Sequence, residues 1–284
     1  MNLSGNPAIQ LLDCRANALT GLDVTCLPRL MKLNCGYNEL TAVDVTKNPL
    51  LSELSCYGNS GLTAVDLTKT PILTRLECYE CGLTSLDLSK NPWLTFLDCD
   101  DTKLTALDLS HNPALKELYC RRNQLTALDV SSCPALKELY CYKNALTALD
   151  VTHCPALTDL ACSYNKLTAL DVTHCPDLSY LNCIKNSLTT LDISASEALC
   201  KAYARGSEEY ELDEEDGGGT YLSYNGDLRV DPGVKIITGA ASALLGDCNG
   251  DGKINRQDRV YLARGLANWD GYPLTDIAAA DVNG

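Results

Sequence analysis

Oxygen-bearing side chains near the C-terminus follow the spacing of a calcium-binding loop. Asp247, Asn249, Asp251 and Asp258 fill positions 1, 3, 5 and 12 of a twelve-residue segment. Carboxylate and amide oxygens in this pattern suit a hard cation that takes about six to eight oxygen ligands. The sequence therefore predicts a Ca²⁺ site, with Gly252 at its tight turn. The expected ligands are Asp247, Asn249, Asp251, the backbone carbonyl of Lys253, Asn255 (directly or through water) and Asp258.

A predicted helix at residues 257–267 and the start of a second loop, at Asp281 and Asn283, follow this segment. The order of these elements over residues 246–284 resembles the dockerin module, with its second half truncated. The resemblance implies a Ca²⁺ cofactor, with Asp281 and Asn283 as further ligands, and the cohesin domain of a scaffold protein as partner. Many dockerins carry Ser-Thr where this chain has Arg-Gln, which implies a different cohesin specificity. The cohesin contacts implied are Arg256, Gln257, Val260, Tyr261 and Arg264.

The rest of the chain offers few groups for catalysis. His111, His153 and His174 all precede Asn-Pro or Cys-Pro, and no Ser/His/Asp set or pair of carboxylates stands out. The net charge of −14 disfavours nucleic acid as a partner. No run of about 18 apolar residues is present, so we expect no membrane span. No signal peptide is visible, and because the repeats begin within a unit we expect a fragment of a longer protein.

A repeat of 21 residues fills the first two-thirds of the chain and is marked by a recurring cysteine. One step is 22 residues long, between Cys56 and Cys78. A fixed period of this length indicates a solenoid, in which each turn buries its apolar residues against its neighbours. The cysteines are Cys14, Cys35, Cys56, Cys78, Cys99, Cys120, Cys141, Cys162 and Cys183.

Each unit divides into two similar halves. Leu118-x-Cys120 and Leu128-x-Val130 both alternate like strands, so we expect two short extended segments per turn, with the better parallel sheet in the first half. Prolines mark one corner of each turn. At the other corner a buried Asn is expected to bond the backbone of the neighbouring turn. These residues are Asn17, Asn38, Asn59, Asn123, Asn144, Asn165 and Asn186.

The unit L-x-x-L-x-C-x-x-N resembles the leucine-rich repeat family, in the short cysteine-containing form of bacterial surface and secreted proteins. The resemblance covers residues 1–205. The second half of each unit carries no helix signal, which departs from commoner members of that family. The expected fold is therefore a mainly β repeat solenoid with parallel strands, followed by a β cap and a small α calcium-loop domain.

The nine repeating cysteines are interpreted as buried thiols. Equivalent side chains on parallel strands lie about 4.8 Å apart with parallel directions. A disulfide needs Cβ atoms about 3.8 Å apart and a specific torsion, so bridges along the column are not expected. Metal binding by the column is an alternative, but no two CxxC pairs face each other. Cys78 and Cys81 form one CxxC, and Cys81 takes the place of the corner Asn, so it is also interpreted as structural.

The two outer faces differ in kind. The second half repeats almost without change and carries one aspartate per turn, from Asp23 to Asp192, which we interpret as a solvated column bonded to Ser and Thr, with a cation-binding stripe as the alternative. The first half varies and gathers aromatic residues with lysines and arginines. Such residues are typical of recognition surfaces, so we expect a ligand face. Its members are Tyr37, Tyr57, Tyr79, Phe96, Tyr119, Tyr140, Tyr142, Tyr164 and Tyr180.

Three units are expected: the solenoid at 1–205, a β-strand cap and linker at 206–240, and the dockerin-like module at 241–284. Strands are predicted around residues 221–223, 228–230 and 235–238, and the acidic run 208–216 is expected to be a solvated loop. The favoured function is a non-catalytic extracellular or bacterial-surface binding protein that takes a protein or polysaccharide ligand. The alternative is a fragment of a secreted dockerin-bearing hydrolase whose catalytic domain lies upstream.

Overall fold

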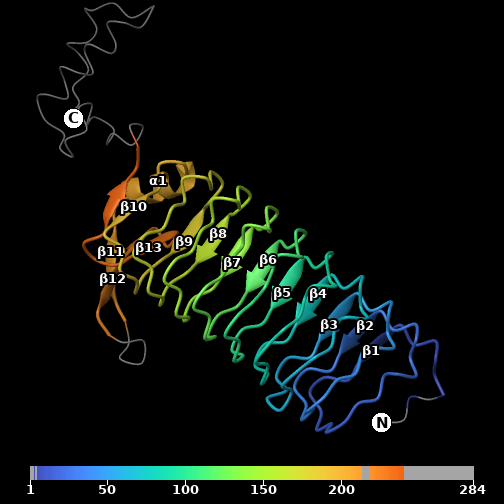
Figure 1. Cartoon of the computed structure of the whole chain (residues 1–284). Coiled ribbons are helices and arrows are strands. Elements are labelled where there is room, and N and C mark those ends of the chain that lie inside the picture. The colour runs from blue at the N-terminus through green and yellow to red at the C-terminus, as the bar shows by residue number, and fades with distance from the viewer. Residues whose placement is uncertain (1–2, 4, 213–217, 240–284) are drawn as a thin grey trace, which may run out of the picture.

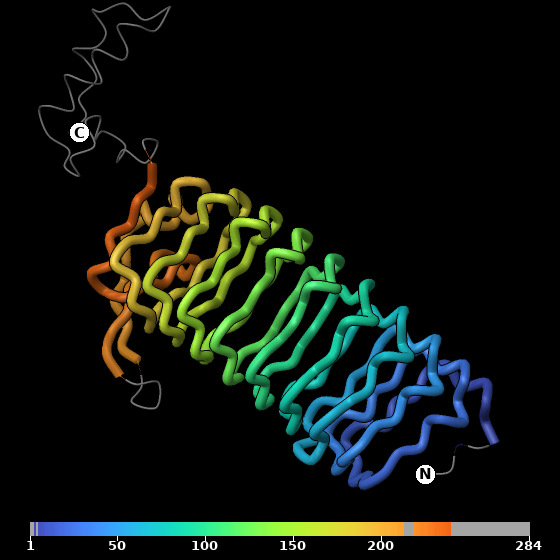
Figure 2. Tube along the Cα trace, in the orientation of Figure 1, coloured from blue at the N-terminus to red at the C-terminus, as the bar shows by residue number. Residues whose placement is uncertain are grey.

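The computed structural model describes residues 3, 5–212 and 218–239, and these form an elongated coil of stacked turns (Figures 1 and 2). One short strand per turn builds a parallel sheet along one side of the coil. These strands are β1 (Leu11–Asp13), β2 (Lys32–Asn34), β3 (Glu53–Ser55), β4 (Arg75–Glu77), β5 (Phe96–Asp98), β6 (Glu117–Tyr119), β7 (Glu138–Tyr140), β8 (Asp159–Ala161) and β9 (Tyr180–Asn182).

The register of the sheet follows the leucine pattern. Leu33 pairs with Leu54, Leu97 with Leu118, and Leu160 with Leu181, so each central leucine stacks on its copy. Its two neighbours in the strand point the other way, toward solvent. The second half of each unit forms no strand until β10 (Thr190–Asp192). The prediction that the first half carries the better sheet is therefore confirmed for the described turns.

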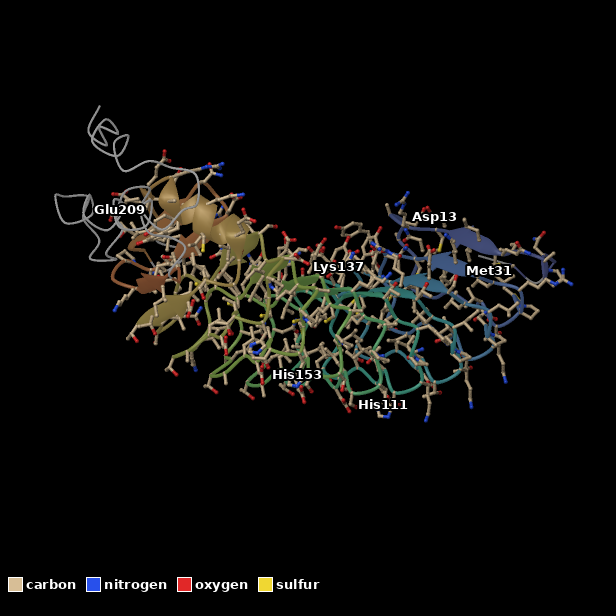
Figure 3. The ribbon with its side chains drawn as sticks, turned by 90° about the horizontal axis from the view of Figure 1, so that it is seen from above. Asp13, Met31, His111, Lys137, His153 and Glu209 are labelled. Carbon is tan, nitrogen blue, oxygen red and sulfur yellow. The ribbon has the colours of Figure 1, made fainter. Side chains whose placement is uncertain are left out.

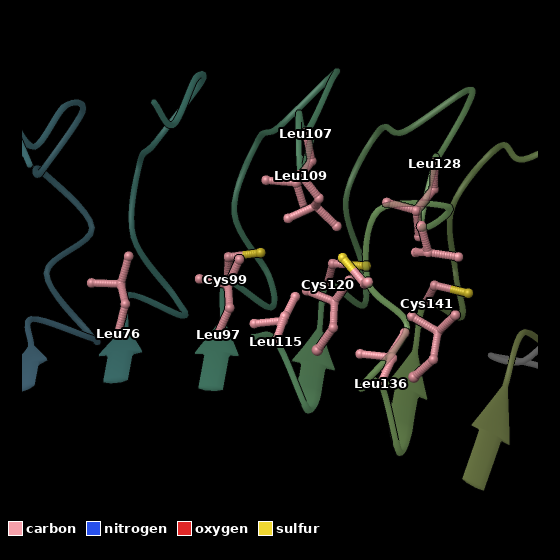
Figure 4. Packing of buried hydrophobic residues seen from close by; sticks show 14 of the residues in the cluster. Leu76, Leu97, Cys99, Leu107, Leu109, Leu115, Cys120, Leu128, Leu136 and Cys141 are labelled. Atoms are coloured by element: carbon pink, nitrogen blue, oxygen red, sulfur yellow. The ribbon is translucent and has the colours of Figure 1, made fainter. Parts of the chain in front are cut away.

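Leucine and cysteine fill the space between the two halves of each turn. Cys99, Cys120 and Cys141 are completely buried and lie among leucines from both halves (Figure 4). All the cysteines that the structure describes are free thiols, as the packing argument expected. A second thiol column, at Cys133, Cys154 and Cys175, occupies the proline corner of three successive turns. The interior is therefore packed with small apolar groups whose size repeats from turn to turn.

The corner asparagines join neighbouring turns. Asn59 is fully buried; its Nδ2 donates to the carbonyl of Cys35 at 3.1 Å, and its Oδ1 accepts from the N–H of Leu40 at 2.9 Å. Both partners lie one turn earlier. The same pair of bonds recurs at Asn38, Asn123, Asn144, Asn165 and Asn186. The predicted role of this asparagine, to satisfy backbone groups at the corner, is confirmed.

The aspartate column of the second half has a local role. Asp44 Oδ1 accepts from the N–H of Thr46 at 2.9 Å and from its hydroxyl at 2.7 Å, and the other turns repeat the N–H bond. The hydroxyl bond lowers the pKa of the exposed Asp44 carboxyl, with help from the N–H. The interpretation as a solvated, hydrogen-bonded column is confirmed. Among the described residues, no group of three or more His, Cys, Asp or Glu side chains could hold a metal ion.

The C-terminal end of the coil is covered by α1 (Glu197–Ala204) and by β11 (Glu208–Glu211), β12 (Thr220–Tyr224), β13 (Leu228–Val230) and β14 (Lys235–Ile237). β13 pairs in parallel with β9, and β14 with β10, so these two strands stand where a further turn would stack. β12 and β11 extend the sheet in antiparallel fashion. The predicted cap strands are confirmed. They complete the hydrogen bonds of the last turn.

One expectation for this region was wrong, and one element was not predicted. Residues 208–211 of the acidic run are a strand, β11, because they pair with β12 from Glu208↔Ser223 to Glu211↔Thr220. The helix α1 was not predicted from the sequence, although its signals are present. Ser196 caps the helix by accepting from the N–H of Leu199 at 3.0 Å, and Glu197 pairs with Lys201 at 2.6 Å across one turn. The predicted dockerin-like module, 241–284, lies outside the described residues.

We call the two bonds that each corner asparagine makes to the preceding turn the ladder bonds. They predict two changes in the free energy of unfolding, of opposite sign. Asn59→Ala should lower the free energy of unfolding by about 3 kcal/mol, because it leaves buried backbone groups of the preceding turn without partners. Thr102 occupies the same corner position in a later turn. Thr102→Asn should raise the free energy of unfolding by about 1 kcal/mol by restoring the bonds to residues 78 and 83. Urea unfolding of both variants checks this. Changes of the same sign in the free energy of unfolding would contradict the proposed role of the corner asparagine.

Candidate functional site

The aromatic residues of the predicted ligand face lie on the solvent side of the sheet and at the adjoining corner. Phe96 and Tyr180 begin strands, and Tyr119 and Tyr140 end them. Tyr57, Tyr79 and Tyr142 follow two residues after a strand, while Tyr37 and Tyr164 sit at the corner with φ of 48° and 54°. We call this surface the sheet face. Asp13, Met31 and Lys137 lie on its side of the molecule, and His111 and His153 lie on the opposite side (Figure 3).

Most of the aromatic rings stack on one another instead of standing free. The rings of Tyr57 and Tyr79 lie 4.6 Å apart and 3° from parallel, and those of Tyr119 and Tyr140 lie 5.0 Å apart and 18° from parallel. Neighbouring strands have nearly this spacing, so rings in equivalent positions meet face to face. Tyr57 is only 7% exposed as a result, and Tyr37, which packs edge-on against it, is 49% exposed.

Two glycines make the edge contact between Tyr37 and Tyr57 possible. A Cβ at Gly36 would lie 2.5 Å from the Tyr57 ring, and one at Gly58 would lie 2.3 Å from the Tyr37 ring. Because real Cβ atoms do not approach so closely, any other residue at either position would displace a ring. The aromatic packing of the first turns is therefore built by four residues together.

Cationic side chains cover further ring faces. The Arg75 guanidinium lies 3.5 Å from the centre of the Phe96 ring, and that of Arg121 lies 5.4 Å from the Tyr142 ring. Lys143 and Arg229 are placed in the same way over Tyr164 and Tyr180. Stacked rings and covering cations present ring edges, hydroxyls and charges to solvent, with few open ring faces.

An acidic cluster crosses the middle of the sheet face. Arg75 pairs with Glu77 at 2.7 Å, and Arg121 forms an ion pair with Asp100, a residue that is 6% exposed. The backbone N–H of Arg121 also donates to Asp100. Glu77 is the register partner of Asp98 on the preceding strand, and Asp100 follows Asp98 by two residues in the same turn. Glu77, Asp98 and Asp100 were not expected as site residues from the sequence, because they become neighbours only when the turns stand side by side.

Comparison with known proteins supports the repeat. A family model described as leucine-rich repeats (two copies) matches residues 113–153, and another described as a leucine-rich repeat matches residues 100–115. This chain is a leucine-rich repeat protein. No curated protein sequence matches the chain.

Several solved leucine-rich repeat structures are similar. The functional domain of InlJ from Listeria monocytogenes, which includes a cysteine ladder, is 35% identical over 70% of this chain, with a TM-score of 0.55. The chain spans 54% of that domain. Internalin C2 from Listeria monocytogenes is 20% identical, with a TM-score of 0.51, over 66% of this chain and 75% of that protein. The ectodomain of the Arabidopsis thaliana receptor kinase GASSHO1/SCHENGEN3 is 21% identical, with a TM-score of 0.59, over 70% of this chain and 26% of that one. The last two show the fold alone.

Burial changes the acid–base behaviour of the sheet face of these repeats. It raises the pKa of Asp98 to about 6, with a further contribution from the charge on Asp100. Burial also raises the pKa of Asp100, against the opposing effects of its bonds to Arg121. The charge of the sheet face therefore changes between about pH 5 and pH 7, where an ordinary aspartate stays ionised.

The other predicted sites have different outcomes. The three histidines are exposed and bonded at most to the preceding hydroxyl, as at Ser110 and His111, 2.9 Å apart. The calcium ligands from Asp247 to Asn283 and the cohesin contacts from Arg256 to Arg264 lie outside the described residues. Within the part of the chain that the structure describes, no helix has the length and apolarity needed to cross a bilayer.

The pKa of Asp98 predicts a pH-dependent stability. Because the folded pKa of about 6 exceeds the ordinary 3.8, ionisation of Asp98 opposes folding as the pH rises from about 4 to about 6. Asp98→Asn, which introduces the residue found at positions 34 and 182 of the same column, should raise the free energy of unfolding at pH 7.5. We expect about 1 kcal/mol, after allowing for solvent screening of a half-buried carboxyl.

The difference in the free energy of unfolding between Asp98→Asn and the unchanged protein should shrink as the pH falls toward 4. Urea unfolding at pH 4.0, 5.5 and 7.5 checks it. Asp129→Asn, on the opposite side, is the matched control. Its exposed carboxyl has a lowered pKa because of a hydrogen bond from Ser131, so its effect should have the other sign.

Proposed function

We propose that the sheet face is a binding surface for a protein partner and that the repeats carry no catalytic activity. The observation that carries this proposal is the mixture of half-buried tyrosines, arginines and carboxylates held in fixed positions on consecutive strands. Tyr and Arg are enriched at the energetic centres of protein interfaces. Rigid aromatic groups with polar tips contribute contact area and lose little conformational entropy on binding.

The geometry of the rings favours protein over polysaccharide. A sugar that stacks on an aromatic side chain needs an open ring face. Here Tyr57 and Tyr79 cover each other, as do Tyr119 and Tyr140, and Arg75 lies over Phe96. The surface instead offers ring edges, the hydroxyl groups of Tyr, and alternating charges, which match the side chains and backbone of a protein.

Binding should depend on the stacked pair at the centre of the sheet face. Tyr119→Ala with Tyr140→Ala should weaken binding of the partner at least about tenfold, because each removes contact area from the middle of the surface. The measurement is surface plasmon resonance against a fractionated extracellular protein pool, with protease-treated and deglycosylated portions alongside. Thr126→Ala with Thr147→Ala, exposed in the second half of the same two turns, is the matched control. Binding that survives protease treatment but not deglycosylation would identify a polysaccharide ligand instead.

We also propose that residues 247–258 bind Ca²⁺ and that the dockerin-like module attaches the repeats to a cohesin-bearing scaffold, outside the cell or at the bacterial surface. The support is the spacing of oxygen ligands in the sequence and the helical pattern that follows it. The second loop begins at Asp281 and has only its first ligands in this chain. Metal binding and module folding are coupled in small domains of this kind. Cohesin binding is therefore expected from a version extended through a second loop.

Calcium binding is tested on the full chain by isothermal titration calorimetry. We expect heat on addition of Ca²⁺, which Asp251→Ala and Asp258→Ala should each abolish because they remove charged ligands. Arg256→Ala should leave the calcium heats unchanged, since its side chain is not a loop ligand, while weakening retention of the extended version by cohesins. Unchanged heats of Ca²⁺ binding in both aspartate variants would rule out the proposed calcium site and, with it, the proposed attachment to a scaffold.

A further inference from the structure

The turn that follows the longest one carries an extra thiol at a corner position that asparagine occupies in most other turns. The step from Cys56 to Cys78 is 22 residues instead of 21, and Cys81 takes the corner place of Asn59 in the turn before. Its Sγ donates to the carbonyl of Cys56 at 3.3 Å. Cys81 thus replaces one of the two ladder bonds and places its sulfur beside a cysteine of the preceding turn.

The thiols of Cys56 and Cys81 interact directly. A hydrogen bond with Cys81, together with burial, raises the pKa of Cys56 well above its ordinary value. The same bond, with a second from the backbone N–H of Asn59, lowers the pKa of Cys81. Cys81 is therefore the more acidic thiol of the pair, and Cys56 keeps its proton to a higher pH. The thiolate is the nucleophilic form of cysteine.

Neighbouring thiols of the main column lack this arrangement. Burial raises the pKa of Cys141 to about 12, so that thiol is neutral and inert at neutral pH. Side chains stacked on parallel strands also point in parallel directions, which opposes bridging. Cys81 approaches from the corner instead of from the strand, so its side chain is directed toward Cys56. It is 4% exposed, whereas Cys56, Cys120 and Cys141 are completely buried.

We propose that Cys56 and Cys81 are an oxidisable thiol pair that a small hydroperoxide converts to a disulfide. The Cys81 thiolate attacks one peroxide oxygen and takes it up as sulfenic acid, and the other oxygen leaves as hydroxide (or alkoxide). The Cys56 thiol then attacks the Cys81 sulfur, the S–S bond forms, and water leaves. In sum, two thiols and one hydrogen peroxide give one disulfide and two waters. The small size of the oxidant suits the slight exposure of Cys81.

The bridge would fasten the long turn, which carries Cys56, to the turn that follows it, which carries Cys81. It closes a loop of 25 residue steps across the one place where the repeat length changes. A cross-link of this kind restricts the unfolded chain and stabilises the folded one. The oxidised protein is therefore expected to unfold at a higher urea concentration than the reduced protein.

The experiment treats the full, reduced chain with hydrogen peroxide at pH 7 after removal of reductant. Samples are quenched, denatured, alkylated and mapped by mass spectrometry. The expected result is loss of two alkylatable thiols and a linked pair of peptides that contain Cys56 and Cys81, reversed by dithiothreitol. This bridge should form at least about tenfold faster than any bridge between Cys120 and Cys141, which are the internal control for stacked thiols.

Cys81→Asn is the matched variant, because asparagine is the usual residue at this corner and keeps the ladder bonds. It should fold, as circular dichroism and urea unfolding report, and should lose no thiols under the same treatment. Cys81→Ser serves as a second variant if the amide does not fit beside the longer turn. Three outcomes would overturn the proposal: no bridge in the folded protein, equal bridging along the column, or accumulation of oxidised Cys81 without a bridge.

Discussion

Backbone hydrogen bonds between neighbouring turns hold the solenoid at one spacing, and the chemistry of every column follows from that distance. Leucines separated by a strand spacing of about 4.8 Å fill the interior without gaps. Tyrosines at the same spacing stack face to face, as Tyr119 and Tyr140 do at 5.0 Å. Aspartates bond to their own turn, where hydroxyl and N–H donors lie within reach. Thiols at that separation pack closely but are too far apart, and too parallel, to bridge.

Much of the fold could be predicted because one sequence pattern occurs nine times along the chain. The leucines fix the strands, the asparagines fix one corner, and Gly-rich and Asn-Gly turns mark the cap strands β12 and β13. The helix α1 was harder to predict from the sequence. Leu199, Ala202 and Ala204 continue the spacing of the leucine and cysteine positions, so they imitate a tenth strand. Helix propensity and the Ser196 cap prevail there, while β13 takes the strand's place beside β9.

The sheet face was predictable in its residues but not in their interactions. Sequence placed the tyrosines on one side, yet Tyr57 is nearly buried between two other rings. The raised pKa of Asp98 also escaped notice, because it depends on the neighbours of Asp98 in adjacent turns and on how deeply it lies. Residues 21 positions apart become nearest neighbours in a solenoid. Properties that arise between turns can therefore be predicted only after the repeats are aligned in columns. In such an alignment Arg75 stands next to Phe96, and Asp100 next to Arg121.

The last strand of the described sheet, β11, has a consequence for how these molecules coexist at high concentration. It lies at the end of the strand order and carries Glu208, Glu209 and Glu211, all exposed. An edge strand with unpaired backbone groups can pair with a strand of a second molecule, and repetition of that pairing produces filaments. Three carboxylates on four residues make such a junction repulsive at neutral pH. The acidic edge thus keeps a long, regular, easily extended sheet from growing beyond its own chain at this end.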